Sequence, residues 1–323
     1  MTILLTGCAG FIGSHLLDRL LANNHKVIGI DDFNDYYAPK IKRLNVSNHL
    51  TNPNFTLIED DINNLTIKQF SAKGRSTSGG NNITIDAIVH LAARAGVRAS
   101  INQPLLYEKV NIAGTLHLLE LAKNLRVKQF IFGSSSSVYG NNTPPPFKET
   151  APCDQPISPY AATKRGAELL CYTYHHLYKI PITILRFFTV YGPRNRPDMA
   201  AFKFTDSVAK GKKIEIYGSG TSRDYTFVDD IVNGIMASLN LSKPQFNVIN
   251  LGNSSPFPLR EFIAAIESTV GKKAILRPKP LPAGDVNATY ADISRAKTLL
   301  GWQPKTDLQT GLRRLWEWYK IRS

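Results

Sequence analysis

Short apolar runs alternate with helical patterns through the first half of the chain. The runs that we expect to form strands, because they are rich in β-branched and aromatic residues, are residues 3–6, 26–30, 55–59, 87–90, 129–133 and 182–187. Between them, apolar residues recur at helical spacing: Leu16, Leu17, Leu20 and Leu21 in one segment, and Leu116, Leu119, Leu121 and Ala122 in another. The pattern therefore predicts an α/β protein with a doubly wound parallel sheet.

The second half has a different composition. Beyond Tyr191 the chain contains more Pro, Gly and Lys, and its periodic segments are shorter. We expect residues 1–188 to form a larger domain to which residues 224–251 return. Residues 189–323 would form mainly a smaller α/β lobe, interleaved with the first domain. Residues 71–82 consist almost entirely of polar residues and glycine, which predicts a surface loop.

The net charge of the chain limits the classes of partner that it can bind. Its 323 residues include 39 Lys and Arg against 25 Asp and Glu, an excess of 14. These cations are dispersed, and no zinc-finger or RNA-binding spacing accompanies them, so we expect no nucleic-acid partner. Small anionic ligands remain as partners for part of the positive charge.

Cysteine usage and hydropathy indicate the compartment. Cys8, Cys153 and Cys171 show no paired spacing, which favours a reducing environment and argues against a zinc or other metal site. The sequence begins without a cationic leader, and no stretch approaches the roughly 18 to 20 apolar residues of a membrane span. We therefore expect a soluble, cytoplasmic protein without a signal peptide, a membrane partner or a metal.

A glycine-rich turn follows the first predicted strand. Gly7, Gly10 and Gly13 have the spacing GxxGxxG, ahead of a helix expected to begin near Ser14. Such glycines let the backbone approach a pyrophosphate at the helix N-terminus, as in Rossmann-type sites, although any tight strand-to-helix turn can use glycine. Asp31 ends the second strand, 18 residues after Gly13, where a carboxylate would bind an adenosine ribose and repel a 2′-phosphate. The pattern favours NAD over NADP; a solvated turn residue is the alternative for Asp31.

A phenol and an ammonium are spaced for one face of a predicted helix. Tyr160 and Lys164 are four residues apart, and Pro159 suits the first turn of that helix. Tyrosine has a pKa of about 10, so a nearby lysine and an oxidised nicotinamide would have to lower it before the phenolate could serve as a general base. Upstream, residues 133–140 (GSSSSVYG) place four hydroxyls at a strand end, where they could donate to a reacting oxygen. A solvated helix face and a serine-rich turn are the alternatives.

Together and in this order, these motifs resemble the extended short-chain dehydrogenases/reductases, which modify nucleotide sugars. The resemblance spans the chain from Thr2 to residues 300–304 (LGWQP). It implies that residues 1–188, with residues 224–251, form an NAD-binding Rossmann-type domain and that residues 189–323 form mainly a substrate-binding lobe. It also implies a catalytic set of Tyr160, Lys164 and Ser135. The residues that it places at the cofactor are Gly7, Gly10, Phe11, Ile12, Gly13, Asp31, Asp61, Ile62, Leu91, Ala92, Asn111, Tyr160 and Lys164.

The resemblance also implies a first chemical step. Tyr160 would take the proton of a sugar 4-hydroxyl while hydride passes from C4 to NAD, leaving a 4-keto sugar. Dehydratases of the family carry an Asp-Glu pair before Val-Tyr and UDP-glucuronate decarboxylases carry a Glu, whereas this chain has Ser136 and Ser137. Without that acid, elimination and decarboxylation are disfavoured. Rotation of the keto sugar and return of hydride to its other face, which is C4 epimerisation, remain.

Three segments are similar to UDP-glucuronate 4-epimerases: residues 33–37 (FNDYY), 90–98 (HLAARAGVR) and 189–200 (TVYGPRNRPDMA). UDP-galactose 4-epimerases typically have Asn at the place of Thr189, and they carry an Arg just before a Gly-Asp where residues 282–285 are Pro-Ala-Gly-Asp. The resemblance thus implies reversible conversion of UDP-glucuronate to UDP-galacturonate. Ser136, Ser137 and Thr189 would hold the sugar carboxylate.

The residues that the resemblance places at the UDP-sugar are Arg98, Ser135, Ser136, Ser137, Thr189, Arg196, Tyr217 and Arg223. Arg196 and Arg223 would face the phosphates, because paired guanidinium groups suit a diphosphate. Tyr217 would pack near uracil. The alternative for each Arg is a surface cation.

Other activities remain open from the sequence. They are 4-epimerisation of UDP-glucose/UDP-galactose or of UDP-N-acetylhexosamines, UDP-glucuronate decarboxylation, and NAD binding by a regulator without turnover. The family usually forms homodimers through two long helices of each subunit, expected here near residues 103–125 and 158–178. Apolar residues that could serve either the core or this interface are Leu169, Leu170, Tyr174 and Leu177.

Overall fold

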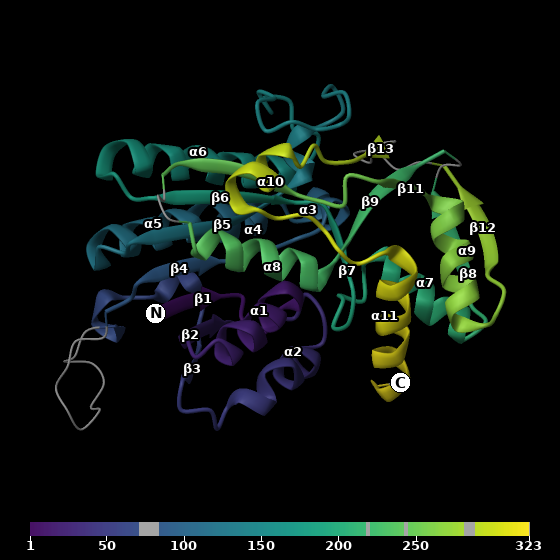
Figure 1. Cartoon of the computed structure of the whole chain (residues 1–323), viewed down its shortest axis with the longest axis horizontal. Coiled ribbons are helices and arrows are strands. Elements are labelled where there is room, and N and C mark those ends of the chain that lie inside the picture. The colour runs from purple at the N-terminus through teal and green to yellow at the C-terminus, as the bar shows by residue number, and fades with distance from the viewer. Residues whose placement is uncertain (71–83, 218–219, 242–244, 281–287, 323) are drawn as a thin grey trace.

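The chain forms a large parallel sheet covered by helices, with a smaller lobe beside it (Figure 1). This structure is a computed structural model that describes residues 1–70, 84–217, 220–241, 245–280 and 288–322. Two sequence interpretations fall outside the described residues: the loop at 71–82 and the Pro-Ala-Gly-Asp segment at 282–285.

Seven parallel strands make up the large sheet, in the order β10-β6-β5-β4-β1-β2-β3. They are β1 (Thr2–Thr6), β2 (Lys26–Asp31), β3 (Phe55–Glu59), β4 (Ala87–His90), β5 (Gln129–Ser135), β6 (Ile182–Phe187) and β10 (Asn247–Leu251). All six strands predicted from the sequence are present, and the doubly wound α/β class is confirmed. The strand order reverses at β1, which pairs with β2 on one side and β4 on the other. Such a reversal opens a crevice at the carboxyl ends of the strands.

Helices cover both faces of this sheet (Figure 1). They are α1 (Phe11–Ala22) and α8 (Val228–Leu239) on one face, and α5 (Gly114–Leu125) and α6 (Pro159–Tyr178) on the other. Side chains alternate across a strand, so Ile3 and Leu5 join the core with α1 while Leu4 joins the core with α5 and α6. The leucines predicted for α1 are buried. Leu116 of α5 is 38% exposed, so it does not belong to the buried face predicted for this helix.

Two helix boundaries differ from the sequence expectation. Helix α1 begins at Phe11, three residues before Ser14, because the last turn of the glycine motif is already helical. The helix expected near 103–125 consists of α4 (Pro104–Glu108), a π-helical turn (Lys109–Ala113) and α5. Helix α6 matches its prediction, since Ser158 caps its N-terminus by accepting a hydrogen bond from the Ala161 amide at 3.1 Å.

The smaller lobe is built around β9 (Ser222–Phe227). Strands β7 (Thr189–Tyr191), β11 (Pro256–Pro258) and β13 (Ala288–Thr289) pair with it, and β8 (Lys213–Tyr217) pairs with β12 (Ile275–Lys279). Its helices are α7 (Ala200–Ala209), α9 (Leu259–Val270) and α11 (Leu308–Arg322). The Tyr225 and Phe262 rings stack in its core at 3.8 Å between centroids. Between β9 and β11 the chain returns to the large domain, where it forms helix α8 and strand β10 of the seven-stranded sheet.

The cysteines pack as small apolar side chains. Cys8, Cys153 and Cys171 are free and buried, and burial raises the pKa of each thiol. Among the described residues, no group of three or more His, Cys, Asp or Glu side chains could hold a metal ion. No helix in the described part of the chain is long and apolar enough to cross a bilayer.

Candidate active site

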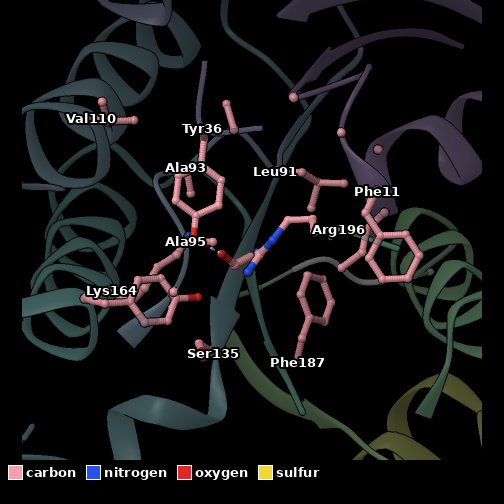
Figure 2. A pocket seen from close by; sticks show the side chains of 18 of the residues that line it. Phe11, Tyr36, Leu91, Ala93, Ala95, Val110, Ser135, Lys164, Phe187 and Arg196 are labelled. Atoms are coloured by element: carbon pink, nitrogen blue, oxygen red, sulfur yellow. Dashed lines mark hydrogen bonds between the residues drawn. The ribbon is translucent and has the colours of Figure 1, made fainter. Parts of the chain in front are cut away.

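A cavity of about 380 Å³ lies at the carboxyl ends of the strands, around the point where the strand order reverses (Figure 2). The turns after β1, β2, β4 and β5, the start of α6 and the segment that contains β7 line it. Ligands of open α/β sheets bind in this position. The sequence-predicted residues that line the cavity are Gly7, Gly10, Phe11, Ile12, Gly13, Asp31, Asp61, Ile62, Leu91, Ala92, Ser135, Ser136, Ser137, Tyr160, Lys164, Thr189 and Arg196.

The glycine turn forms one end of this cavity. Gly7 has a φ of +72°, which a residue with a side chain rarely adopts. A Cβ on Gly13 would lie 1.9 Å from the Gly7 carbonyl oxygen, so only glycine lets α1 start this close to β1. Gly10 is the N-cap of α1 and supplies no side-chain cap. The first-turn amides of α1 are therefore available to an anion.

Asp31 is buried beside the glycine turn, with 7% of its surface exposed. Its two carboxylate oxygens accept one hydrogen bond each, from the amides of Ala9 and Phe33 at 3.0 Å, and each keeps capacity for a further donor. Burial raises the pKa of Asp31, while Lys42 acts in the opposite direction. The alternative of a solvated turn residue is wrong. Lys42, on α2 (Pro39–Val46), also lines the cavity and donates to the Asn34 carbonyl at 2.8 Å.

Asp61 and Ile62 close the same end of the cavity after β3. The Asp61 carboxylate accepts hydrogen bonds from the amide and the side chain of Asn63, both at 2.9 Å. Sequence reasoning found these residues but missed Lys42. A lysine on a mostly polar helix carries no local sign that its ammonium is turned toward a cavity.

The Tyr–Lys pair lies on the first two turns of α6, opposite the end of β5. The Lys164 ammonium is buried and donates to the Gly133 carbonyl at 2.7 Å. Burial lowers its pKa to about 8. Burial raises the pKa of the Tyr160 phenol, whereas a hydrogen bond with Ser135 and the charge of Arg196 lower it. Ser135 also accepts a hydrogen bond from the Ser137 amide at 3.2 Å. The three catalytic candidates thus meet at one place.

Arg196 enters the cavity from the segment after β7 (Figure 2). Its guanidinium forms a two-pronged pair with Asp198, at 3.0 Å from Nε to Oδ1 and 2.8 Å from Nη2 to Oδ2. The Tyr36 hydroxyl donates to the same carboxylate at 3.3 Å, and the Tyr36 ring lies 5.5 Å from the guanidinium. Asp198 therefore joins the loop after β2 to the loop after β7. Sequence reasoning assigned no role to Tyr36 or Asp198 because this contact spans 162 residues.

A smaller cavity of about 130 Å³ continues from the first. Ser136, Ser137 and Thr189 line both cavities, and Arg223 lines only the second. The hydroxyl side chains expected at the sugar therefore lie between two cavities. One contains the Tyr–Lys pair, and the other contains Arg223, which we predict to bind a phosphate. No carboxylate is among the described residues that line this second cavity.

Asn111 does not line either cavity, so its contact with the cofactor stays a prediction. It is buried in the π-helical turn, where its side chain accepts from the Arg94 amide at 2.9 Å and donates to the Arg94 carbonyl at 3.0 Å. It also donates to the Thr163 hydroxyl at 3.0 Å. Asn111 thus fixes the loop after β4 against α6 from behind.

Arg98 and Tyr217 lie outside the lining of both cavities as well. They contact each other, with the guanidinium 4.4 Å from the ring centroid. The Tyr217 hydroxyl donates to Glu215 at 2.8 Å. This contact joins α3 (Val97–Asn102) of the large domain to β8 of the smaller lobe. Contacts of these two residues with a nucleotide stay predictions.

A doubly wound sheet with a glycine turn, an acidic end of β2 and a Tyr–Lys pair on α6 defines an extended short-chain dehydrogenase/reductase. The chain matches the family model described as GDP-mannose 4,6 dehydratase over residues 4–315, and it belongs to that family.

Named relatives narrow the comparison. The chain is 44% identical to a UDP-glucuronate 4-epimerase of Thermodesulfobacterium geofontis (strain OPF15), over 98% of this chain and 95% of that protein. It is similar to a UDP-glucuronic acid 4-epimerase from Bacillus cereus, solved in complex with UDP-glucuronic acid and NAD, with a TM-score of 0.92, 38% identity and 100% of both chains covered. A UDP-glucose 4-epimerase from Thermotoga maritima, solved with UDP-glucose, gives a TM-score of 0.87 at 31% identity, covering 100% of this chain and 99% of that one.

Proposed function

We propose that the protein is an NAD-dependent epimerase that interconverts UDP-glucuronate and UDP-galacturonate through a 4-keto intermediate. The observation that carries this proposal is the cavity lining, which includes the hydroxyl side chains of Ser136, Ser137 and Thr189. Ser136 and Ser137 occupy the two places before Val-Tyr where the resemblance puts the acid of dehydratases and decarboxylases. The relatives named UDP-glucuronate 4-epimerase support the same substrate.

The residues at the main cavity fit NAD. The first-turn amides of α1 suit its pyrophosphate, and the buried Asp31 carboxylate keeps capacity for the hydroxyls of its adenosine ribose. Lys164 and Tyr160, which line the same cavity, would face its nicotinamide. When bound, NAD supplies the acceptor and the donor of the hydride.

Side chains of this protein transfer the proton of the sugar 4-hydroxyl. Tyr160 accepts the proton of the sugar 4-hydroxyl as hydride leaves C4, and it returns the proton when hydride comes back on the other face. The buried ammonium of Lys164 favours the phenolate by its charge. Ser135 holds the reacting oxygen, since its hydroxyl already contacts Tyr160.

A 4-keto uronate is a β-keto acid and loses CO2 when its carboxylate bond aligns with the carbonyl π system. Hydrogen bonds from Ser136, Ser137 and Thr189 in the plane of the carboxylate resist this rotation. No described acid at this place protonates a leaving group. Epimerisation is therefore favoured over decarboxylation.

The test is product analysis with three substrates. Purified protein is incubated separately with UDP-glucuronate, UDP-glucose and UDP-N-acetylglucosamine, and the products are resolved by chromatography. We expect UDP-galacturonate from the first and little product from the others. A faster reaction of UDP-glucose or UDP-N-acetylglucosamine would move the assignment to those sugars, and UDP-xylose or a 4-keto pentose as the main product would contradict it.

Tyr160→Phe is the matched control for these incubations. It removes the hydroxyl that carries the proton and leaves the ring in place. We expect product formation to fall by about three orders of magnitude or more, with NAD still bound. A variant that retains turnover would contradict the role of Tyr160. A wild-type protein that binds NAD and converts none of the three sugars would favour a regulator.

We further propose a cytoplasmic homodimer that pairs α4, α5 and α6 of two subunits. Free, buried cysteines support a reducing compartment. Of the apolar residues considered for the interface, Tyr174 is buried and Leu170 packs against the core. The exposed apolar side chains on these helices are Leu105, Leu116, Leu169, Tyr172, Leu177 and Tyr178.

A further inference from the structure

A buried ion pair lies behind the catalytic pair, where α6 faces the sheet. Glu168 is one helical turn beyond Lys164, and 1% of its side chain is exposed. Its Oε1 accepts hydrogen bonds from Ser134 Oγ at 2.6 Å and Arg186 Nε at 2.9 Å, and its Oε2 accepts from Arg186 Nη2 at 2.7 Å. Arg165 adds a fourth hydrogen bond at 2.9 Å. Neither Glu168 nor Arg186 lines a cavity, so neither contacts a ligand there.

Stability alone is a weak reason for such a pair. Removing both charges from water costs several kcal/mol per ion, and a buried pair is often no more stabilising than apolar residues of the same volume. Its geometry has a clearer consequence. Two consecutive residues of β5 contact two residues spaced one turn apart on α6: the Gly133 carbonyl accepts from Lys164, and the Ser134 hydroxyl donates to Glu168. The next residue, Ser135, lines the main cavity together with Tyr160. Because Ser134 points back toward Glu168, Ser135 points toward the cavity.

We propose that Glu168 is a positioning residue for the epimerase: held by Arg186 and Ser134, it fixes the catalytic side of α6 against β5 and places a negative charge beside the Lys164 ammonium. The proposal rests on the proposed function, because it assigns Glu168 to that reaction. It predicts separate effects of the charge and of the hydrogen bond.

The surroundings of Lys164 make the charge effect specific. The titratable groups around it are Tyr160, Glu168 and Cys171 on α6, His90 on β4 and, behind Glu168, Arg186 on β6. Burial holds the pKa of Cys171 high and that of His90 low, so both are neutral near pH 7. Burial opposes the charge of Glu168, but Arg186 and Ser134 hold its pKa below the ordinary value. Among these groups, Glu168 is the anion that favours a protonated Lys164.

Glu168→Gln removes the charge and keeps the shape of the side chain. NMR of protein with isotope-labelled lysine follows the Lys164 ammonium, whose pKa is lowered by burial to about 8. Its signal is assigned by its loss in Lys164→Arg. We expect the Lys164 midpoint to fall on the order of one pH unit in Glu168→Gln. We expect kcat to fall on the order of 10- to 100-fold while KM changes less.

Two further variants separate charge from position. Ser134→Ala breaks one hydrogen bond but keeps both charges, so kcat falls severalfold and the Lys164 midpoint stays. Arg165→Gln removes a cation from the same carboxylate, so the midpoint does not fall. A folded Glu168→Gln protein with an unchanged Lys164 midpoint would overturn the proposal. A wild-type kcat in Ser134→Ala would also overturn it, and this second variant tests the proposal if Glu168→Gln does not fold. The NMR titration needs no turnover, so it tests the charge effect separately from the reaction. If the wild-type protein has no epimerase activity but Glu168→Gln lowers the Lys164 midpoint as expected, the result contradicts the proposed function alone.

Discussion

Tyr160 illustrates how the surroundings of one side chain set its chemistry. Burial raises the pKa of its phenol, whereas the hydrogen bond with Ser135 and the charge of Arg196 lower it. The phenol is therefore protonated at neutral pH in the protein alone. Proton transfer from the sugar needs the positive charges of Lys164 and of an oxidised nicotinamide together, which links general-base activity to the presence of the cofactor.

Thr189 provides a test at the scale of one residue. Thr189→Val keeps the shape and removes the hydroxyl that would hold the uronate carboxylate. A hydrogen bond to a charged group contributes about 1.5–3 kcal/mol, so KM for UDP-glucuronate should rise about 10-fold or more. A freer carboxylate should also release more CO2 and UDP-pentose per turnover. Steady-state kinetics with product chromatography measures both, and an unchanged KM would remove Thr189 from the substrate site.

At the scale of elements, the site depends on how β1, α1, β5 and α6 meet. The strand-turn-helix unit at Gly7 and Gly13 brings the N-terminus of α1 to the cavity. The contacts between β5 and α6 bring Ser135 to the Tyr–Lys pair. We therefore expect a substitution in the β1–α1 turn to weaken ligand binding and a substitution in the β5–α6 contact to slow proton transfer.

Gly13→Ala tests the first unit. The added Cβ would lie 1.9 Å from the Gly7 carbonyl oxygen, so α1 must move away from the turn. We expect NAD affinity to fall by about 10-fold or more, together with a lower melting temperature, because overpacking typically costs about 1–3 kcal/mol. Calorimetric NAD titration measures the affinity. Gly220→Ala is the control, since a Cβ there meets nothing within 4 Å; equal NAD affinity of the two variants would contradict the close approach.

At the scale of the whole molecule, the two lobes share one buried apolar cluster, and both contribute residues to the two cavities described. Residues of the smaller lobe, Ala201 and Phe262 among them, belong to the same buried cluster as Leu5 and Leu17 of the large domain. Arg223 of β9 and the hydroxyl side chains of Ser136 and Ser137 after β5 line the same cavity. The cavities use only a few of the cations behind the net charge of +14.

Association of two subunits is tested on α6. Leu169 is 53% exposed on this helix, and a charge there would be desolvated in the proposed interface. We expect Leu169→Arg to shift the protein from dimer to monomer in light scattering at micromolar concentration. Ile321→Arg is the control, because Ile321 is 86% exposed on α11, which lies apart from α5 and α6 (Figure 1). A wild-type protein that is already a monomer would reject the dimer.

Local patterns determined the framework of this protein. The six predicted strands, the helix capped by Ser158, the glycine turn and the Tyr160–Lys164 spacing follow from interactions within a few residues, where steric limits and side-chain alternation act directly. The start of α1 was set too late because helix ends depend on contacts as well as on propensity.

Only the tertiary structure decided which side chains meet. Asn111 holds a loop rather than lining the cavity, Lys42 lines the cavity that Asp31 also lines, and Asp198 joins two distant loops. Glu168 is linked to Ser134 and Arg186 across 34 and 18 residues. Their charges carry no periodic signal, because a solvated and a buried charge look alike in a sequence. Packing alone removes the water and thereby fixes which carboxylate faces which cation.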